Sequence, residues 1–295
     1  MSNLTKRYLK FIKKQETIGE KFYDKKKQLK NFYLPLCLKL FKIYKTKNRP
    51  ILIGLSGSQG SGKSTISQII KIILNTNFNL NVISFSIDDF YKTLFERKKL
   101  SKSIHPLFMT RGVPGTHDSK MLYNTIKILL NKNFHSIKIP KFDKSIDDRS
   151  KSKFWQKIKK KPDIIIFEGW CVGAKPQTFK ELKKPMNILE KDEDTKLTWR
   201  KKVNNELKTN YKKIFNLLDK KIYLKVPNFR FVLKWRLLQE KKLKFKFKKK
   251  VMTSNEITRF IMFYERLTKN MIKDLKKNDT VIMIDKNHKI KSIKF

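Results

Sequence analysis

Short apolar runs alternate along the chain with longer segments in which apolar residues recur at helical spacing. The apolar runs predict strands at residues 51–55, 81–87, 136–139, 163–167, 221–226 and 280–284. The helical spacing predicts helices at residues 63–75, 119–131, 197–217, 228–243 and 254–276. Because such alternation favours right-handed βαβ crossovers, we expect an α/β fold whose mostly parallel sheet is covered by helices on both faces.

The first 46 residues contain no predicted strand and read as helical. Apolar positions such as Tyr8 and Ile12 recur there at helical spacing. We therefore expect a helical extension over residues 1–46, packed on an α/β domain that covers residues 47–295. Within that domain, the lysine-rich residues 241–250 are interpreted as either a solvated helix end or a mobile lid.

Basic residues outnumber acidic residues, with 71 Lys and Arg against 25 Asp and Glu, which gives a formal net charge of +46. A surface of this kind attracts polyanions, so nucleic acid or an anionic membrane is one interpretation. We favour composition drift in an AT-rich genome, because lysine, asparagine and isoleucine are abundant, arginine is rare, and basic residues are spread along the chain. We therefore expect no specific nucleic-acid partner.

Cysteine usage and hydropathy indicate the cellular setting. Cys37 and Cys171 lack metal-ligand spacing and predict neither a disulfide framework nor a zinc site. No apolar run approaches the roughly 18 residues that a spanning helix requires, and the N-terminus lacks the apolar stretch of a secretory signal. We expect a cytoplasmic protein with no membrane partner, and the sequence leaves the oligomeric state open.

Glycine is scarce, with 9 among 295 residues, so its positions indicate where backbone geometry resists a side chain. All but one glycine fall into three groups, which we take as candidate site loops: Gly54, Gly57, Gly60 and Gly62; Gly112 and Gly115; Gly169 and Gly173. Arginine is also scarce, and three arginines lie in or beside segments of interest: Arg111, Arg149 and Arg236. Other arginines, such as Arg97, lie outside these segments.

The segment GSQGSGKS matches the phosphate-binding pattern G-x-x-x-x-G-K-[ST]. It lies between an apolar strand and a helix, as the mechanism requires, because backbone N–H groups and the positive helix end cradle phosphates. Lys63 is expected to reach the β and γ phosphates of ATP, and Ser64 to ligate Mg²⁺. The candidate ATP-binding residues are Gly57, Ser58, Gln59, Gly60, Ser61, Gly62, Lys63, Ser64 and Thr65.

Acidic residues follow two of the predicted strands. Asp88 and Asp89 come directly after the second strand, and Glu168 comes after the fourth. Open α/β sheets bind ligands at the carboxyl ends of their strands, so we interpret one of these two aspartates as the base for an attacking hydroxyl. Glu168 is interpreted as a metal-site residue together with Ser64. The alternatives are a helix N-cap for Asp88 and an exposed strand-end acid for Glu168.

The segment RGVPGTHD, residues 111–118, is too rich in special backbone residues for an ordinary helix or strand. It offers the guanidinium of Arg111 and the imidazole of His117 within a few positions, and we interpret it as an acceptor-binding loop. Tyr91, just after the Asp-Asp pair, is a further candidate for acceptor binding. A structural turn histidine is the alternative for His117.

Basic residues elsewhere could neutralise an acceptor or a phosphate. Lys144 and Arg149 follow the third predicted strand and either clamp a carboxylate or phosphate or form a solvated charge cluster. Arg236, in the predicted helix 228–243, is a candidate catalytic lid residue over the nucleotide phosphates. A surface arginine paired with Glu240 is the alternative for Arg236.

Six segments together resemble the D-glycerate 3-kinase family, which belongs to a wider P-loop group with uridine kinase, pantothenate kinase and phosphoribulokinase. The segments are Gly57–Ser64, Ser86–Tyr91, Arg111–Asp118, Ile139–Lys144, Phe167–Trp170 and Trp235–Glu240. The likeness runs from about Tyr33 to Asp285. One departure is the loop after Lys144, which is shorter than in plant members and lacks their glycine-rich stretch before Arg149.

The resemblance implies a P-loop NTPase fold and an enzyme that uses ATP and Mg²⁺ to convert D-glycerate to 3-phosphoglycerate. It carries over Lys63 and Ser64 as phosphate and Mg²⁺ residues, Asp88 as the base and Glu168 as the second strand-end acid. Residues 47–295 would then be a kinase domain with acceptor-binding insertions and a helical lid. The alternatives are a kinase for a nucleoside, pantothenate or a sugar phosphate, a nucleic-acid-dependent ATPase, and a non-catalytic ATP-binding regulator.

Overall fold

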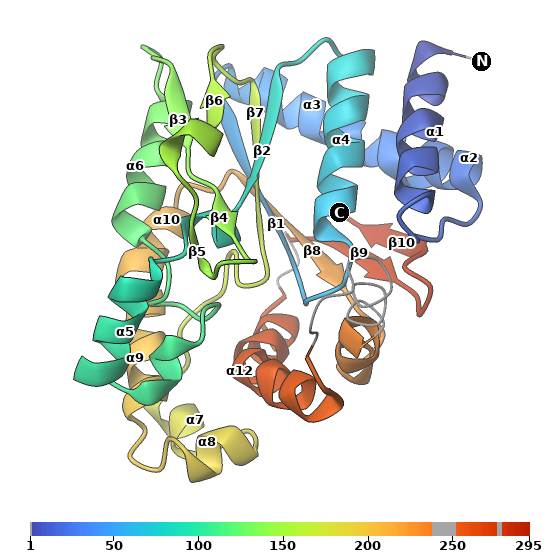
Figure 1. The fold of residues 1–295 in the computed structure, drawn as a ribbon. Coiled ribbons are helices and arrows are strands. Elements are labelled where there is room, and N and C mark those ends of the chain that lie inside the picture. Colours follow the sequence, from blue (N-terminus) through green and yellow to red (C-terminus); the bar gives the residue numbers. More distant parts are fainter. Residues whose placement is uncertain (1, 238–251, 276–278) are drawn as a thin grey trace.

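A six-stranded sheet with the strand order β10-β9-β8-β1-β7-β2 forms the centre of the computed structural model (Figure 1). The structure describes residues 2–237, 252–275 and 279–295. The sheet contains β1 (Ile51–Gly57), β2 (Val82–Ser86), β7 (Ile164–Gly169), β8 (Lys220–Lys225), β9 (Thr280–Ile284) and β10 (Ile290–Lys294). Its pairs are parallel except for β9 and β10, which form an antiparallel hairpin at the edge.

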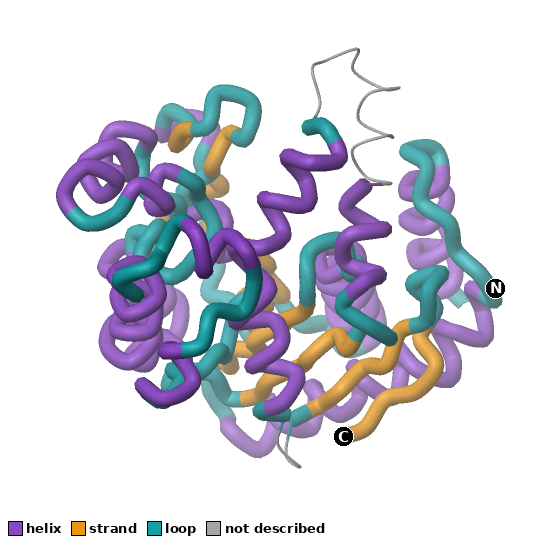
Figure 2. The backbone as a smooth tube through the Cα atoms, turned by 90° about the horizontal axis from the view of Figure 1, so that it is seen from below, coloured by secondary structure: helices purple, strands orange, loops and turns teal. Residues whose placement is uncertain are grey.

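Side-chain alternation along the buried strands explains why helices cover both faces of the sheet. Ile51 and Ile53 of β1 lie in one hydrophobic cluster, whereas Leu52 lies in a second cluster. Both sets are fully buried, as expected for a parallel strand between two helical layers. The twisted sheet runs through the molecule with helices on both sides (Figure 2). The predicted fold class, a P-loop NTPase fold with a mostly parallel sheet, is confirmed.

The helices stand on both sides of the sheet in Figure 1. They are α1 (Asn3–Glu16), α2 (Lys25–Gln28), α3 (Leu34–Lys47), α4 (Lys63–Asn77), α5 (Leu94–Ser103), α6 (Ser119–Leu130), α7 (Phe179–Lys183), α8 (Ile188–Asp192), α9 (Thr198–Glu206), α10 (Lys212–Phe215) and α12 (Ser254–Lys273). One-turn π-helices at Leu29–Tyr33 and Leu207–Tyr211 continue neighbouring helices. Short 3₁₀ turns lie at Ile87–Phe90, Pro106–Met109 and Ser152–Phe154.

The N-terminal extension shares its core with the sheet. Tyr8 and Ile12 of α1 are almost fully buried, in the same hydrophobic cluster as Ile51 and Ile53 of β1. The extension therefore completes one face of the α/β unit, although the boundary between the two predicted parts stays a prediction. The expectation of helix throughout residues 1–46 is wrong at the loop between α1 and α2, where Gly19 has a φ of 88°.

The predicted strand 136–139 forms, but its expected place in the central sheet is wrong. β3 (Ile137–Ile139) pairs antiparallel with β6 (Gln156–Ile158) in a separate two-stranded sheet. β3 is only three residues long and Lys138 at its centre is exposed, whereas a central parallel strand must bury both faces. A second small sheet pairs β4 (Phe142–Asp143) with β5 (Asp148–Arg149).

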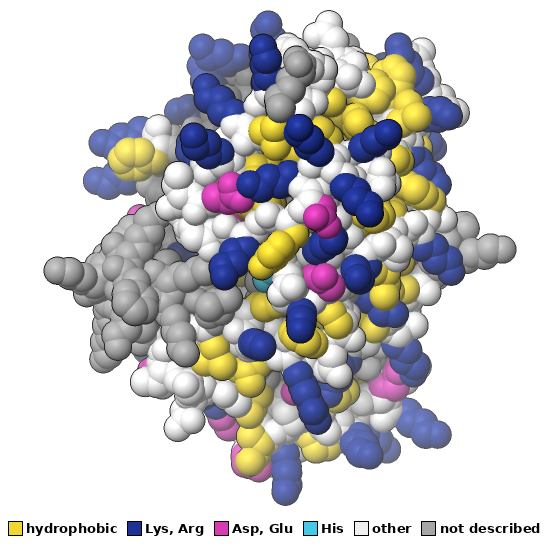
Figure 3. Space-filling model, turned by 90° about the vertical axis from the view of Figure 1, so that its right-hand side faces the viewer, with side chains coloured by type: hydrophobic (Ala, Val, Ile, Leu, Met, Phe, Trp, Pro, Cys, Tyr) yellow, Lys and Arg dark blue, Asp and Glu magenta, His cyan; other side chains and the backbone are white. Residues whose placement is uncertain are grey.

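The predicted helix 228–243 is helical over residues 230–237. Glu240, the proposed partner of Arg236, and residues 241–250 lie outside the described residues. Basic side chains are dispersed over the face shown in Figure 3, with few acidic side chains among them. None of the helices in the described ranges is long and apolar enough to cross a membrane.

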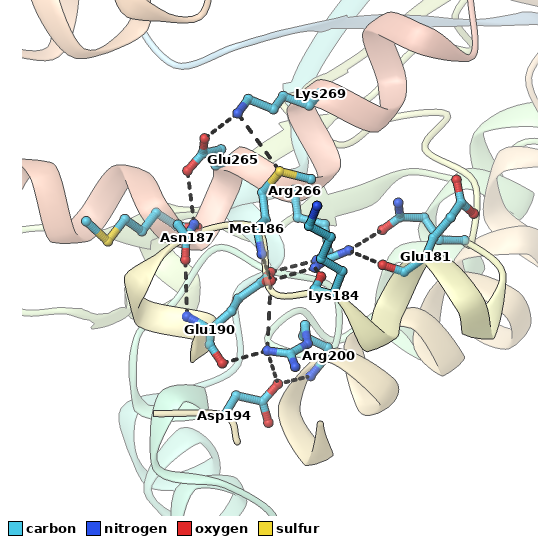
Figure 4. A network of polar contacts seen from close by, with 12 residues as sticks. Glu181, Lys184, Met186, Asn187, Glu190, Asp194, Arg200, Glu265, Arg266 and Lys269 are labelled. Carbon is cyan, nitrogen blue, oxygen red and sulfur yellow. Dashed lines mark hydrogen bonds and ion pairs between the residues drawn. The ribbon is translucent and has the colours of Figure 1, made fainter. Parts of the chain in front are cut away.

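A buried ion network joins the segment that carries α7, α8 and α9 to α12 (Figure 4). Arg266 of α12 donates to both carboxylate oxygens of Glu190 at 2.7 and 2.6 Å. Arg200 of α9 lies 3.8 Å from Glu190 and 3.3 Å from Asp194. Arg266 also donates to the backbone carbonyls of Glu181 and Lys184, at 3.0 and 2.6 Å. The short helices α7 and α8 are thus held by charged hydrogen bonds as well as by apolar packing.

We predict that Glu190→Gln destabilises the protein by about 3–5 kcal/mol, because the buried guanidinium groups of Arg200 and Arg266 lose the charge of the carboxylate that both contact. The matched control is Glu193→Gln, whose ion pair with Arg259 has side chains 40% and 50% exposed. Exposed ion pairs contribute about 1 kcal/mol or less, so the free energy of unfolding of this control should stay close to that of the parent. Chemical denaturation measures the free energy of unfolding of both variants. Equal losses of stability in the two variants would contradict a stabilising role for the buried network.

Candidate active site

The phosphate-binding loop joins β1 to α4 at the carboxyl edge of the sheet. Gly62 is the N-cap of α4 and has a φ of 87°, a left-handed conformation that favours glycine. Lys63 donates to the carbonyl of Ser58 at 2.8 Å, and burial lowers the pKa of Lys63 while nearby Glu168 and Asp88 oppose this shift. Side-chain atoms of Ser58, Gln59 and Ser61 are buried without a hydrogen-bond partner among the residues described. Such a loop is built to receive a polar ligand.

Glu168, the last acid of β7, faces the start of α4. The hydroxyl of Ser64 donates to Glu168 Oε1 at 2.7 Å. Glu168 Oε2 is buried and has no hydrogen-bond partner within the described ranges. Burial raises the pKa of Glu168, while Lys63 and the Ser64 hydroxyl oppose the rise.

The oxygen atoms of Ser64 and Glu168 fit the preference of Mg²⁺ for hard oxygen ligands. No group of three or more His, Cys, Asp and Glu residues that could hold a metal occurs in the part of the chain that the structure describes.

Asp88 lies in the turn after β2 and is held by two donors. Tyr91 donates its hydroxyl to Asp88 Oδ1 at 2.8 Å, and Lys144 donates to Asp88 Oδ2 at 2.8 Å. Burial alone would raise the pKa of Asp88, but the charge of Lys144 and the two hydrogen bonds outweigh burial and lower it to about 2. Asp88 is therefore ionised at neutral pH.

The neighbouring Asp89 has a different environment. One of its oxygens accepts from the backbone N–H of Ser86 at 3.3 Å and so closes a capping box for the turn. Its other oxygen lies 2.9 Å from Lys141. Asp88 thus faces Lys144 and Tyr91, whereas Asp89 supports the turn.

His117 lies at the end of the glycine-rich segment 111–118 and is buried. Its ring stacks on that of Tyr91, with centroids 4.7 Å apart, and its Nδ1 lies 2.5 Å from the Tyr211 hydroxyl. The hydroxyl also accepts from the Gly115 N–H at 3.2 Å, and Nε2 of the ring is buried without a hydrogen-bond partner among the described residues. Burial lowers the pKa of His117 to about 4, so the ring is neutral at physiological pH.

Arg97, which gave no signal in the sequence, organises the loops around Asp88. It is 1% exposed and donates to the carbonyls of Lys92, Met109 and Asp147 at 3.3, 2.8 and 2.6 Å. Arg111 pairs with the side chain of the same Asp147. These bonds tie the segment that follows Asp88 to the loop that carries Lys144.

The remaining candidate arginines also contact protein groups. Arg149 donates to the carbonyl of Tyr91 at 3.1 Å and lies 3.5 Å from an oxygen of Asp118. Arg236 lies over the ring of Phe260, with its guanidinium carbon 5.5 Å from the centroid. Trp235, its neighbour, packs beside Gly60 of the phosphate-binding loop. The helix of Arg236 is therefore next to the loop, as a lid helix would be.

A cavity of about 680 Å³ opens between the phosphate-binding loop and the loop of Lys144. Five residues that face it are Ser64, Asp88, Lys141, Lys144 and Glu168. Tyr91 does not line it but donates its hydroxyl to Asp88, which does. Three further predicted acceptor residues also lie outside the lining and contact Asp147 or Tyr91: Arg111, His117 and Arg149. We name this cavity the acceptor-side pocket.

Residues 52–210, more than half of the chain, match the phosphoribulokinase / uridine kinase family (PRK). The chain belongs to this family. The matched residues include the phosphate-binding loop, Asp88 and Glu168. Family membership makes the chain a P-loop kinase and supports its use of ATP as phosphoryl donor. The resemblance to P-loop kinases seen in the sequence is confirmed.

Two relatives of this chain are named as kinases, and the matches cover different shares of their lengths. An uncharacterized kinase of Schizosaccharomyces pombe, mug58, is 35% identical over 228 residues, which cover 75% of this chain and 80% of the relative. The chloroplastic D-glycerate 3-kinase of Arabidopsis thaliana is 28% identical over 232 residues, which cover 73% of this chain and 48% of the relative. This chain thus spans about half the length of the plant enzyme.

Among solved structures, D-glycerate 3-kinase from Cryptococcus neoformans var. grubii serotype A is similar to this chain with a TM-score of 0.75. The match covers 88% of this chain and 98% of that structure at 22% sequence identity. At this identity the likeness establishes the shared fold.

We predict that Lys144→Gln raises the pKa of Asp88, since the charge of Lys144 is the main factor that lowers it. Carbon-13 NMR titration of the aspartate carboxyls measures the change. Because the pKa of Asp88 is lowered by folding, its contacts stabilise the fold above the ordinary carboxyl pKa and are lost as pH falls toward about 2. Lys141→Gln is the matched control: it removes an equally exposed lysine that pairs with Asp89. An unchanged Asp88 pKa in Lys144→Gln would refute the pairing.

Proposed function

We propose that this chain transfers the γ-phosphoryl group of ATP to a hydroxyl of D-glycerate and forms 3-phosphoglycerate. The observation that carries the proposal is the acceptor-side pocket, where Asp88 and Lys144 face Ser64 and Glu168 across one cavity. A hydroxyl bound in this pocket would lie between a carboxylate and the phosphate-binding loop. That arrangement suits in-line transfer.

Two lysines of the acceptor-side pocket could hold the carboxylate of a small acceptor, beside four acidic residues that also line it: Asp88, Asp89, Asp143 and Glu168. Lys141 and Lys144 line the pocket, and each has a side chain about 60% exposed. A carboxylate would pair with these ammonium groups, which strengthens binding without a large apolar surface. The name of the Arabidopsis relative adds D-glycerate as the specific candidate.

Lys144 also connects acceptor binding to the basicity of Asp88. While Lys144 pairs with it, Asp88 has a pKa of about 2 and accepts a proton poorly. We infer that a substrate carboxylate draws Lys144 away and leaves Asp88 to orient the hydroxyl and take its proton. The ammonium of Lys63 would neutralise phosphoryl oxygens, and the guanidinium of Arg236 would add to this as a lid residue.

Magnesium, held through Ser64 and Glu168, would neutralise charge on the phosphate oxygens when bound. The cytoplasmic location stays a prediction, supported by two buried free cysteines, Cys37 and Cys171. The absence of a nucleic-acid partner also stays a prediction.

An acceptor screen tests the substrate. Purified protein with ATP and Mg²⁺ should consume ATP with D-glycerate and much more slowly with uridine, pantothenate or ribulose 5-phosphate. Lys63→Ala should be inactive with every acceptor, because the loop loses its point charge on the phosphates. Faster turnover of another acceptor would replace D-glycerate, and activity retained by Lys63→Ala would remove the assigned ATP site.

The two aspartates give a matched test of the proposed base. Asp88→Asn keeps the size of the side chain but cannot take a proton, so kcat with D-glycerate should fall by roughly 10²–10⁴-fold with ATP binding little changed. Asp89→Asn should cost much less, because Asp89 closes a capping box and pairs with Lys141. Equal losses would leave the base unassigned, and a larger loss for Asp89→Asn would move the assignment.

A further inference from the structure

Three buried ring side chains lead from Asp88 into the core behind the acceptor-side pocket. Tyr91 donates its hydroxyl to Asp88, and the ring of His117 stacks on that of Tyr91. The hydroxyl of Tyr211 lies 2.5 Å from Nδ1 of His117. Tyr91, His117 and Tyr211 are 3%, 1% and 0% exposed, so water does not substitute for a contact that one of them loses. We name these three residues the aromatic brace.

Tyr211, the far end of the aromatic brace, comes from a distant part of the chain. It is the last residue of the one-turn π-helix Leu207–Tyr211, which lies between α9 and α10. Its ring packs edge-on against the rings of His117 and Phe215, each with centroids 5.8 Å apart. The position of the ring is thus fixed by packing, and the hydroxyl adds directed hydrogen bonds to it.

The Tyr211 hydroxyl also holds the backbone of the segment that carries His117, because it accepts from the Gly115 N–H at 3.2 Å. The same segment is bonded to the turn that carries Tyr91. Two backbone hydrogen bonds join them, from the Lys92 N–H to the Thr116 carbonyl at 2.9 Å and from the Asp118 N–H to the Phe90 carbonyl at 2.7 Å. A shift of segment 115–118 would therefore move Tyr91 through its backbone as well as through the ring stack.

We propose that Tyr211 is a positioning residue for the catalytic base and acts on Asp88 through His117 and Tyr91. This inference rests on the proposed function, in which Asp88 takes the proton of the acceptor hydroxyl. Positioning of this kind matters because a displacement of about 1 Å at the reacting groups can cost roughly 10²-fold in rate.

The aromatic brace also determines which oxygen of Asp88 takes the proton. Burial and the charge of Asp88 raise the pKa of Tyr91 well above its ordinary value, so the Tyr91 hydroxyl keeps its proton and donates to Oδ1. The other oxygen, Oδ2, accepts from Lys144. Once Lys144 turns to a substrate carboxylate, Oδ2 is the oxygen that is left to face the acceptor hydroxyl.

The test is Tyr211→Phe, which removes the hydroxyl and keeps the ring. Nδ1 of His117 and the N–H of Gly115 then lose the partner that they share, and the aromatic brace loosens. In folded protein, kcat with D-glycerate should fall by roughly 10–100-fold, whereas KM for ATP should stay unchanged. Steady-state kinetics measures both constants. A merely structural role would lower the free energy of unfolding and leave the kcat of folded protein unchanged.

The pKa of Asp88 is a second readout, and it requires no acceptor. Burial raises this pKa, whereas Lys144 and the hydrogen bond from Tyr91 lower it. A loosened brace should therefore raise the pKa of Asp88 in Tyr211→Phe, as measured by carbon-13 NMR titration. If the acceptor screen replaces D-glycerate, this measurement still decides the role of Tyr211.

Tyr91→Phe tests the near end of the aromatic brace. It removes the hydrogen bond to Asp88 directly, so kcat should fall and the pKa of Asp88 should rise by at least as much as in Tyr211→Phe. This variant keeps the proposal testable even where Tyr211→Phe does not fold.

The matched control is Tyr44→Phe. The Tyr44 hydroxyl donates to Asp163 at 2.6 Å just before β7, at the opposite edge of the sheet. This variant also loses a tyrosine hydrogen bond, but it should keep the kcat and the Asp88 pKa of the parent. An unchanged kcat or an unchanged Asp88 pKa in either brace variant would overturn the proposal. Equal losses of kcat in Tyr44→Phe and Tyr211→Phe would also overturn it, because kcat would then report stability alone.

Discussion

The parallel register of β1, β7 and β2 is the constraint on which the site depends. β1 pairs with β7 so that Leu55 is opposite Glu168, and β7 pairs with β2 so that Glu168 is opposite Ser86. The phosphate-binding loop, Glu168 and the turn with Asp88 therefore leave the sheet at one edge. Ser64 and Glu168 are 104 residues apart in the chain, yet this register brings their side chains to 2.7 Å. A shift of one residue in either pairing would turn Glu168 to the other face.

Charge compensation at that edge follows from the same register. Burial disfavours the charged forms of both Lys63 and Glu168, and each opposes the shift of the other. Asp88 receives its compensation from Lys144 on a loop that Arg97 fixes. Basic side chains are spread over the face shown in Figure 3, whereas the site depends on a few paired groups. A bound polyphosphate would enter a region where cations and anions are already balanced.

The sequence predicted the parts of the site that follow from local pattern and strand ends: the phosphate-binding loop, Asp88 and Glu168. It did not predict contacts between distant segments, such as Tyr211 with His117, 94 residues apart, or Gln28 with Ile290, 262 residues apart. Arg97 was missed because it lies in a helix with no motif, and its three carbonyl partners come from turns. Gly112 was marked by the scarcity of glycine and by its place in the segment RGVPGTHD. Two reasons require glycine there: a φ of 132°, and a collision that a Cβ would make with the hydroxyl of Tyr264 on α12.

The central proposal is that the phosphate-binding loop presents the γ-phosphate of ATP to an acceptor hydroxyl at Asp88. The most direct measurement is a crystal structure with Mg²⁺, a non-hydrolysable ATP analogue and D-glycerate. We expect the γ-phosphate beside Ser64 and Glu168 and the glycerate hydroxyl next to Asp88. A base bound in the acceptor-side pocket, or a glycerate remote from Asp88, would contradict the account.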